Sequence, residues 1–399
     1  MLNDYPNNND NNGGNVEVST TPVVILKRAK RARRLRKTLK IILISLTSFM
    51  LVVACTAVAV VMPLVRDYYN SVTEIPFISR SDDYTLPPMP TGTFETVGTE
   101  DYTPTETETS DIPVLNPGNS DGIYIKDKID PDVENILVIG TDSTNLSLYR
   151  GRSDSMIICS YNKRTGTAKL VSLLRDMLVH IEGHGWNRLN AAYSFGGISL
   201  CINTINNMFD LDIQRFVIIN FEGTENLVDA CGGVDLPLTD KGSYNEKDYI
   251  IENGGTVRKN SDGTYHLDGK SALIHMRQRK GSSDFKRTER QRNVITAIFR
   301  QVVSTSDISR IYKLVQKGFA MVKTNITLDQ MYELALDVAG NGADMRIDSY
   351  KLPTQYQTVY YNFSTQSFTT SSDPKKASVL FISDMKEQAK VLNQYLYGK

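Results

Sequence analysis

The sequence predicts a membrane-anchored α/β domain with a mixed sheet. Three observations lead to this prediction: a long uncharged apolar run near the N-terminus, an acidic segment rich in Thr and Pro after it, and short β-branched runs that alternate with helical patterns from residue 131 onward. With 399 residues, 40% of them hydrophobic and 23% charged, the chain can bury a sizeable core. These values exclude a small disulfide scaffold and a fully disordered polymer.

The apolar run covers residues 41–65 and contains no charged side chain. A helix of this length, rising about 1.5 Å per residue, spans the roughly 30 Å hydrocarbon core, and it is longer than the apolar part of a cleaved signal peptide. All nine Lys and Arg of the first 65 residues precede it. This bias predicts a disordered basic cytoplasmic tail over residues 1–40, a transmembrane helix over 41–65 and export of the rest. The basic run could also be a nucleic-acid-binding patch, but its place beside the apolar run favours a topology signal.

The segment 66–130 is predicted to be an extracellular stalk. Its part from Ser81 to Asp121 contains nine acidic residues, nine threonines and six prolines, with no Lys or Arg. Such a composition buries little apolar surface and is stiffened by proline. Residues 131–399 are then left for one large catalytic domain.

Within residues 131–399, short apolar runs predict strands and longer periodic runs predict helices. The expected elements are, in order, a buried strand at Asn135–Gly140, a hairpin of Ser155–Tyr161 and Ala168–Leu174 around the turn Asn162–Gly166, a helix at Ala191–Phe209, a strand at Phe216–Asn220 and a helix at Phe285–Val303. A hairpin beside strands that alternate with helices predicts a mixed sheet.

The cysteines and histidines predict neither a disulfide framework nor a zinc site. Cys159 falls in a predicted strand as a small core residue, and Cys201 and Cys231 could form a disulfide outside the cell or remain thiols. The four histidines are scattered, without the spacing of metal ligands.

Acidic residues and arginines gather at three places in the domain. The first group holds Asp142, Arg152 and Asp154, the second Arg175 and Asp176, and the third Arg277, Arg279, Asp284, Arg287 and Gln291. Arg277 and Arg279 would point to one side of an extended segment, whereas the spacing of Asp284, Arg287 and Gln291 places them on one helix stripe. Taken singly, such residues are often turn formers, helix caps or a solvated face, and Asp176 could equally cap a helix, orient Arg175 or accept a proton.

Several arginines and two aspartates in one place predict a pyrophosphate site. Guanidinium groups bind phosphate oxygens in pairs and keep their charge at any working pH. Carboxylates beside them would repel that anion unless a hard cation lies between, and Mg²⁺ (or Mn²⁺) prefers such oxygen ligands. The sequence therefore predicts a cation-assisted pyrophosphate site outside the membrane.

The order of these clusters resembles the LytR-CpsA-Psr family of bacterial envelope enzymes. The segments that carry the resemblance are Asn135–Asp142, Arg152–Asp154, Arg175–Asp176, Leu189–Tyr193 with Gly196 and Gly197, Leu227–Asp229 with Gly232–Val234, Leu267–Gly269 with Ala272, Arg277–Arg279, and Asp284–Arg287 with Arg290 and Gln291. They span about residues 134–300. The chain departs from the family at Thr144, where many members have Arg, at Leu174, where many have Pro, and at Arg188, where Lys is common.

This resemblance implies a three-layer α/β/α domain that moves an anionic glycopolymer, of teichoic acid or capsular polysaccharide type, from a polyprenyl-pyrophosphate carrier to peptidoglycan. It implies that Asp142 and Asp154 hold Mg²⁺ and that Arg152, Arg175, Arg277 and Arg279 bind the pyrophosphate. Asp284, Arg287 and Gln291 would line the same cleft, with Asp284 or Asp176 taking the acceptor proton. The implied location is the cell membrane of a Gram-positive bacterium.

Two other functions use parts of the same sequence pattern. A polyprenyl-pyrophosphate pyrophosphatase would use the same arginines with water as nucleophile. A non-enzymatic transcriptional attenuator would need the cytoplasmic tail to bind DNA, but about 40 residues without a helix-turn-helix pattern predict no nucleic-acid partner.

Overall fold

A computed structural model describes residues 75–79, 85–92, 95–96, 122–141, 153–239, 245–278, 284–303, 314–315, 317–318, 321–341 and 345–398. All of them belong to the second of the two units into which the chain divides, Tyr68–Lys399. The predicted tail, residues 1–40, and the predicted transmembrane helix, residues 41–65, lie outside the described residues. Within the described ranges, no helix combines the length and the apolar character that crossing a bilayer requires.

The centre of the domain is a mixed sheet, which has six strands among the described residues. Across the sheet they are β12 (Val322–Thr324), β8 (Arg215–Asn220), β3 (Val133–Thr141), β4 (Ser153–Asn162), β5 (Thr167–Leu173) and β13 (Arg346–Leu352). The pairs β3–β8 and β5–β13 are parallel, and the pairs β3–β4, β4–β5 and β8–β12 are antiparallel. The predicted α/β class, mixed sheet and hairpin are confirmed.

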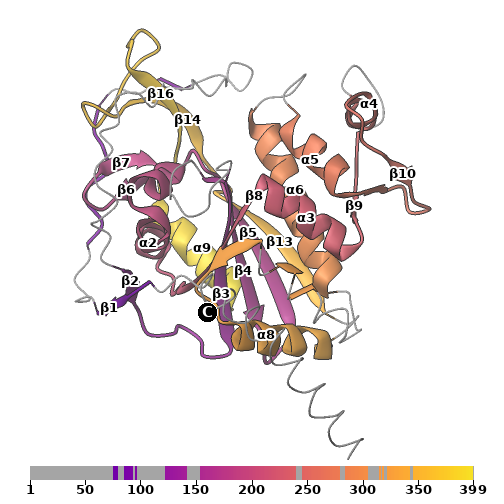
Figure 1. The fold of residues 1–399 in the computed structure, drawn as a ribbon. Helices are drawn as coiled ribbons and strands as arrows, with labels where there is room; N and C mark the ends of the chain where they lie inside the picture. The colour runs from indigo at the N-terminus through magenta and orange to yellow at the C-terminus, as the bar shows by residue number, and fades with distance from the viewer. Residues whose placement is uncertain are drawn as a thin grey trace, which may run out of the picture. The chain divides into compact units, whose positions relative to one another are not determined.

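Helices cover both faces of this sheet, so the domain has three layers (Figure 1). The alternation of side chains along the strands sends Leu137 and Ile158 to one face and Ile157 and Leu170 to the other. The first face packs against α2 (Leu189–Phe209) and α9 (Met385–Tyr397). The second packs against α6 (Asp284–Val303) and α8 (Leu328–Asn341).

Smaller elements surround the three layers. On the α6 side they are α3 (Phe221–Cys231), β9 (Val234–Leu236), α4 (Glu246–Glu252), β10 (Arg258–Lys259), β11 (Tyr265–Leu267) and α5 (Gly269–Arg277). On the α2 side lie two hairpins, one of β6 (Leu178–Ile181) with β7 (Gly185–Arg188) and one of β14 (Gln357–Asn362) and β16 (Lys376–Phe381) with the short β15 (Ser367–Phe368). We call the β14–β16 unit the C-terminal hairpin.

Helix α2 matches the prediction in length but is broken in the middle. Gly197 has φ +64° and Gly196 lies outside the helical region, so two helical segments meet there. A side chain on Gly196 would collide with Leu200, since its Cβ would lie 2.7 Å from two Leu200 carbons. The two glycines are therefore needed for the change of direction.

Parts of the segment predicted as a stalk belong to the folded domain. Strand β1 (Phe77–Ser79) pairs in parallel with β2 (Ile123–Ile125), and the side chain of Ile123 is fully buried in the main core. Leu86 and Met89 pack against the same core. The few apolar residues of an otherwise polar segment find partners on the domain, which averaging the composition over residues 66–130 conceals.

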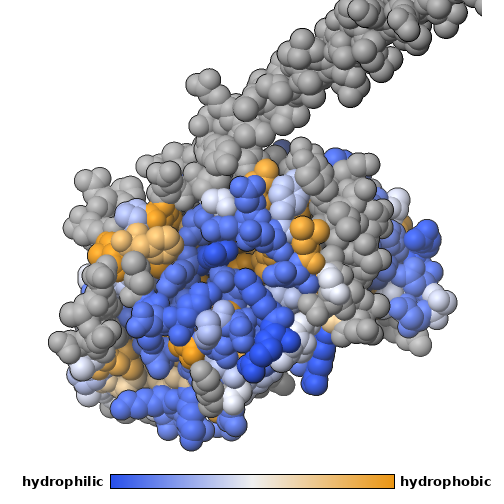
Figure 2. All heavy atoms as spheres, turned by 90° about the horizontal axis from the view of Figure 1, so that it is seen from below, coloured by the Kyte–Doolittle hydropathy of each residue, from blue (hydrophilic) through white to orange (hydrophobic). Residues whose placement is uncertain are grey.

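The described face seen in Figure 2 is mainly hydrophilic, with apolar residues in small separate groups. The large hydrophobic side chains that remain exposed, Phe77, Ile251, Leu336 and Tyr356, come from different elements. Apolar residues scattered in this way are normal for a protein surface.

No disulfide joins Cys201 to Cys231 in the described structure. Cys201 packs in the main core and Cys231 packs in a second hydrophobic cluster around α3 and α5. Burial raises the pKa of the Cys159 and Cys201 thiols to about 12, which keeps them as unreactive core side chains.

Candidate functional site

The first two groups of sequence-predicted site residues adjoin one edge of the central sheet in the chain. Strands β3, β5, β8 and β13 point the same way, so their carboxyl ends meet at the edge where antiparallel β4 begins. Asp142 follows β3 directly, Arg152 precedes β4, and Arg175 lies two residues beyond β5. The topology thus brings together two of the three clusters that the sequence keeps apart.

Part of this edge lies outside the described residues. Asp142, Arg152 and Arg279 are not among them, and for Asp154 and Asp284 only the backbone is described. Among the described side chains, no group of three or more His, Cys, Asp and Glu is placed to hold a metal ion. The predicted ligands Asp142 and Asp154 are not among these side chains.

The backbone of β3 and β4 is irregular where the predicted metal ligands lie. Gly140 pairs with Ser155 and Thr141 pairs with Ser153, so Asp154 is the extra residue of a β-bulge. A Cβ on Gly140 would lie 2.5 Å from the Ser155 hydroxyl, so any side chain there would force this hydroxyl to move. The bulge brings the backbone of Asp154 beside the end of β3, from which Asp142 continues.

A small cavity, which we call the strand-end cavity, lies between this edge and α6. It is lined by Gly140, Thr141, Ser155, Ile219, Asn220, Phe221, Thr224, Met276, Gln291 and Ile295, and it has a volume of about 10 Å³. Gln291 is 2% exposed and Ser155 is 3% exposed, yet the Gln291 Oε1 and the Ser155 Oγ have no hydrogen-bond partner within the described part of the chain. Buried polar atoms are nearly always paired, so these two mark a place for a water or a ligand group.

Helix α6 carries one wall of the site, as the spacing predicted. Asp284 is its first residue, Arg287 lies one turn further and is half-buried, and Gln291 reaches the strand-end cavity. The prediction that these three residues share one helix is confirmed.

Arg277 differs from its predicted conformation. It is the last residue of helix α5 and therefore has a helical backbone; the residue after it, Gln278, is extended. The helix begins upstream, where the Asp268 carboxylate caps it by accepting from the Ser271 N–H at 2.8 Å. The exposed guanidinium of Arg277 lies 4.8 Å from the centre of the Phe221 ring, and Phe221 also lines the strand-end cavity.

Arg290, quoted in the sequence pattern without a role, holds α5 against α6. It is 3% exposed, and its Nε donates to the His275 carbonyl at 3.1 Å while its Nη2 donates to the Gln278 carbonyl. Its Nη1 lies 3.6 Å from Glu246. Arg290 thus satisfies the carboxyl end of α5, which carries Arg277.

Arg175 belongs to a separate group, which we call the hairpin-supported arginine cluster: Arg175, Asp176 and Arg188. The Asp176 Oδ2 lies 3.6 Å from the Arg175 Nε and its Oδ1 lies 3.6 Å from the Arg188 Nε. Arg188 also donates to the Ser378 carbonyl of the C-terminal hairpin from Nε at 3.1 Å and from Nη2 at 2.7 Å. Both Asp176 oxygens are engaged by guanidinium groups, which supports the interpretation that Asp176 orients Arg175.

Sequence reasoning missed Ser155, Gln278 and the function of Arg188. Ser155 looks like one polar position in an apolar strand, and Gln278, 1% exposed with an Oε1 that lacks a described partner, looks like an ordinary residue between two arginines. The signal for Arg188 lies in Ser378, 190 residues away in the chain. No local pattern could have indicated that contact.

A three-layer α/β/α domain with charged residues just beyond the carboxyl end of β5 belongs to the class of α/β domains that bind ligands at the carboxyl ends of parallel strands. The sequence model of the LytR_cpsA_psr family matches residues 102–377. This chain belongs to that family.

Relatives of known name support this assignment. The chain is 31% identical over 236 residues to the polyisoprenyl-teichoic acid–peptidoglycan teichoic acid transferase TagU of Halalkalibacterium halodurans, covering 58% of this chain and 73% of the relative. It is 31% identical over 245 residues to the protein of the same name from Bacillus subtilis, covering 59% and 74%.

Solved structures show the same fold. A crystal structure of B. subtilis TagV covers 67% of this chain and 98% of its own, with a TM-score of 0.51 and 24% identity. The crystal structure of protein gbs0355 from Streptococcus agalactiae covers 66% and 88%, with a TM-score of 0.51 and 26% identity.

Proposed function

We propose that this protein transfers an anionic glycopolymer of the teichoic acid type from a polyprenyl-pyrophosphate carrier to peptidoglycan. The names of its 31% identical relatives support this substrate pair. The observation that carries the proposal is the strand-end cavity, where the unpaired Gln291 Oε1 and Ser155 Oγ lie beside the residue that precedes Asp142. Buried polar atoms without partners, next to predicted carboxylates and arginines, fit a site completed by its substrate.

In this proposal the arginines bind the pyrophosphate. Arg175 and Arg277 approach the edge from the β5 loop and from the end of α5, and Arg152 and Arg279 are the proposed further contacts. Each guanidinium offers paired donors to phosphate oxygens without needing a proton from solvent. Holding the pyrophosphate in one place supplies most of the rate gain in phosphoryl transfer.

The transfer step is a substitution at the phosphorus that carries the glycan. A sugar hydroxyl of peptidoglycan forms the new O–P bond, the bridging P–O bond breaks, and polyprenyl phosphate leaves with the electron pair. The hydroxyl proton goes to a carboxylate of the site. Asp284 at the start of α6 is the proposed base, because both oxygens of Asp176 already pair with arginines.

A divalent cation, Mg²⁺ or Mn²⁺, is proposed to be held by Asp142 and Asp154. The β-bulge supports this set, since it brings the backbone of Asp154 next to the end of β3. Oxygen ligands of this kind suit a hard cation, which when bound neutralises charge on the phosphate oxygens.

The proposed location is the outer face of the cytoplasmic membrane of a Gram-positive bacterium. The uncharged run 41–65 and the nine cations before it support a single span with the N-terminus inside. The domain at residues 131–399, with its folded extension upstream, would then face peptidoglycan.

The test uses the full chain in phospholipid vesicles with a polyprenyl-pyrophosphate glycopolymer and peptidoglycan fragments. A covalent glycan–peptidoglycan product supports transfer, whereas free polymer phosphate indicates a pyrophosphatase. Arg277→Ala should lower turnover by roughly 10- to 100-fold, the value of a lost charge-assisted contact, while Lys386→Ala on α9 should leave it unchanged. Wild-type turnover of Arg277→Ala would contradict the site.

A further inference from the structure

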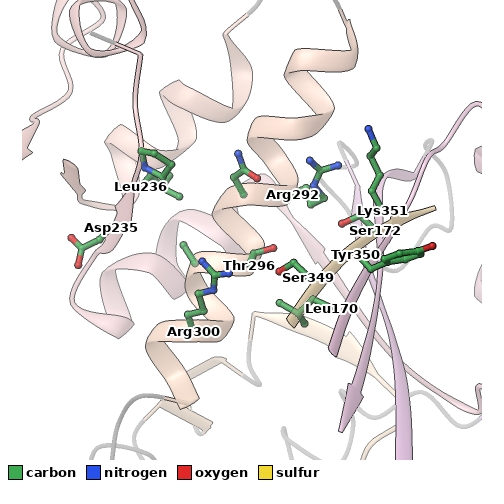
Figure 3. A pocket seen from close by; sticks show the side chains of 13 residues that line it. Leu170, Ser172, Asp235, Leu236, Arg292, Thr296, Arg300, Ser349, Tyr350 and Lys351 are labelled. Carbon is green, nitrogen blue, oxygen red and sulfur yellow. The ribbon is translucent and has the colours of Figure 1, made fainter. Parts of the chain in front are cut away.

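A groove with both charged and apolar residues in its lining runs between α6 and the central sheet, next to the strand-end cavity but separate from it. It has a volume of about 370 Å³, and its walls come from α6, from β5 and β13, and from β9 (Figure 3). Arg292 and Arg300 line it from α6 and Lys351 lines it from β13, with the hydroxyls of Ser172 and Ser349 between them. No residue of the proposed pyrophosphate site is in its lining.

The described charges of the groove are mainly positive. The three cations face one acid, Asp235 of β9. Asp235 is already engaged, because its Oδ1 accepts from the Asn260 Nδ2 at 2.8 Å and lies 2.9 Å from the His266 Nδ1. Arg292 has one acidic neighbour on its own helix, Glu289, at 3.4 Å. The balance favours an anionic ligand.

The groove begins where the proposed donor site ends. Arg292 follows Gln291 directly in α6, and Lys351 pairs in register with Ser172, three residues before Arg175. In Figure 3 the side chains of Arg292 and Lys351 extend toward the same end of the groove. A molecule whose pyrophosphate lies by Gln291 could therefore continue into the groove without leaving the surface of α6.

The cations are also spaced for a repeating anion. Arg292 and Arg300 are eight residues apart on one helix, so their backbones are about 12 Å apart along its axis. In Figure 3 the side chains of Arg292 and Arg300 lie in different parts of the groove and do not converge on one point. An extended chain with several phosphates could reach both, and the serine hydroxyls offer donors to the sugar or polyol units between them.

We propose that this groove binds the phosphodiester chain of the donor glycopolymer, beyond its pyrophosphate. This inference rests on the proposed function and adds the part of the substrate that the groove recognises. The groove then holds the polymer by charge while the sheet edge holds the reacting phosphates. Peptidoglycan peptides, the other anion present, carry a few carboxylates without a repeat and fit the spacing less well.

The experiment measures binding of lipid-free poly(glycerol phosphate) to the full chain in nanodiscs by isothermal titration calorimetry. The double variant Arg300→Gln/Lys351→Gln should bind this polymer about tenfold more weakly, and the difference should shrink with added salt. The matched control is Lys386→Gln/Lys390→Gln, two exposed lysines of α9 on the other side of the sheet, which should bind like wild type.

Three outcomes would contradict polymer binding in the groove. The double variant could bind the polymer as tightly as wild type, or the control variant could lose as much polymer affinity as the double variant. The double variant could also lose more affinity for soluble muropeptides than for the polymer. If inorganic phosphate binds with the same dissociation constant per site as the polymer, the groove does not recognise an extended chain. Polymer binding requires no turnover, so the groove can stand when transfer fails. Conversely, if the double variant binds the polymer normally and also transfers it normally, the groove proposal is refuted and the proposed transferase function is not.

Discussion

The hairpin-supported arginine cluster and the strand-end cavity lie at the same sheet edge but differ in how their polar atoms are satisfied. In the cluster, Asp176 pairs with two arginines, and Arg188 is fixed to the C-terminal hairpin by two hydrogen bonds. In the cavity, Gln291 and Ser155 are buried with unpaired oxygens. The ion pairs on both oxygens of Asp176 indicate that this carboxylate has a supporting role, whereas the unpaired oxygens of Gln291 and Ser155 indicate a place for substrate.

The largest expected effect tests the supporting contacts. Arg290→Ala removes the donors for two carbonyls at the end of α5 and leaves Glu246 without its buried partner, so the free energy of unfolding should fall by roughly 3 kcal/mol. Fluorescence of Trp186, the only tryptophan and a buried core residue, reports unfolding in urea. Lys286→Ala, at an exposed position on the same helix, is the control and should change stability by less than about 0.5 kcal/mol. Equal stability of both variants would show that Arg290 is not a structural link.

A substitution in the strand-end cavity should lower turnover and leave stability nearly unchanged, the opposite of Arg290→Ala. Gln291→Ala should lower turnover by roughly 30- to 100-fold, because a contact to the reacting phosphates is lost, yet it removes an unsatisfied buried oxygen and should not destabilise the fold by more than about 1 kcal/mol. Turnover and the Trp186 unfolding curve are measured on the same preparations. A loss of stability as large as that of Arg290→Ala would place Gln291 among the supporting residues.

A pH dependence follows from His275 at the end of α5. Burial, with a smaller contribution from the charge of Arg290, lowers the pKa of His275 to about 3. The unfolded chain titrates near pH 6.5, so between these values the unfolded state binds one more proton and stability falls as the pH falls. From pH 7.5 to pH 5 the loss at His275 should be roughly 2 kcal/mol. His275→Phe should remove this part of the pH dependence, and an unchanged slope would refute the assignment.

A smaller effect is expected at Asp176. Asp176→Asn keeps the size of the side chain but removes the charge between Arg175 and Arg188, so the donor KM should rise about tenfold while the pH profile of kcat keeps its shape. Asp284→Asn should instead lower kcat and flatten that profile, as loss of a base does. The reverse pattern would exchange the two roles.

The smallest change is expected at Ser155. Ser155→Ala removes a buried hydroxyl without a described partner, so stability should stay within about 1 kcal/mol of wild type or rise. A stability loss above 2 kcal/mol would show that the hydroxyl makes a structural hydrogen bond. Gln291 would then be the remaining unpaired residue that supports a substrate site in the cavity.

The sequence predicted the strands and the sheet edge well, because both depend on local patterns. The run Asn135–Gly140 is short and β-branched, and the carboxyl-end position of Asp142 follows from it. The prediction that Arg277 is extended was wrong, because the helix that begins after Asp268 continues as far as Arg277. The role of Arg188 could not be predicted, because its acceptor lies in a hairpin formed by another part of the chain.

The acceptor of Arg188 is a main-chain oxygen of β16, so the side chain at position 378 carries no information about this contact. What matters is the register in which Ser378 stands opposite Tyr360. A substitution at 378 would leave the arginine anchored, whereas a single inserted residue in β16 would turn that carbonyl away and loosen Arg175 from a distance. The number of residues in this hairpin therefore matters more for the contact than the identity of the residue at position 378.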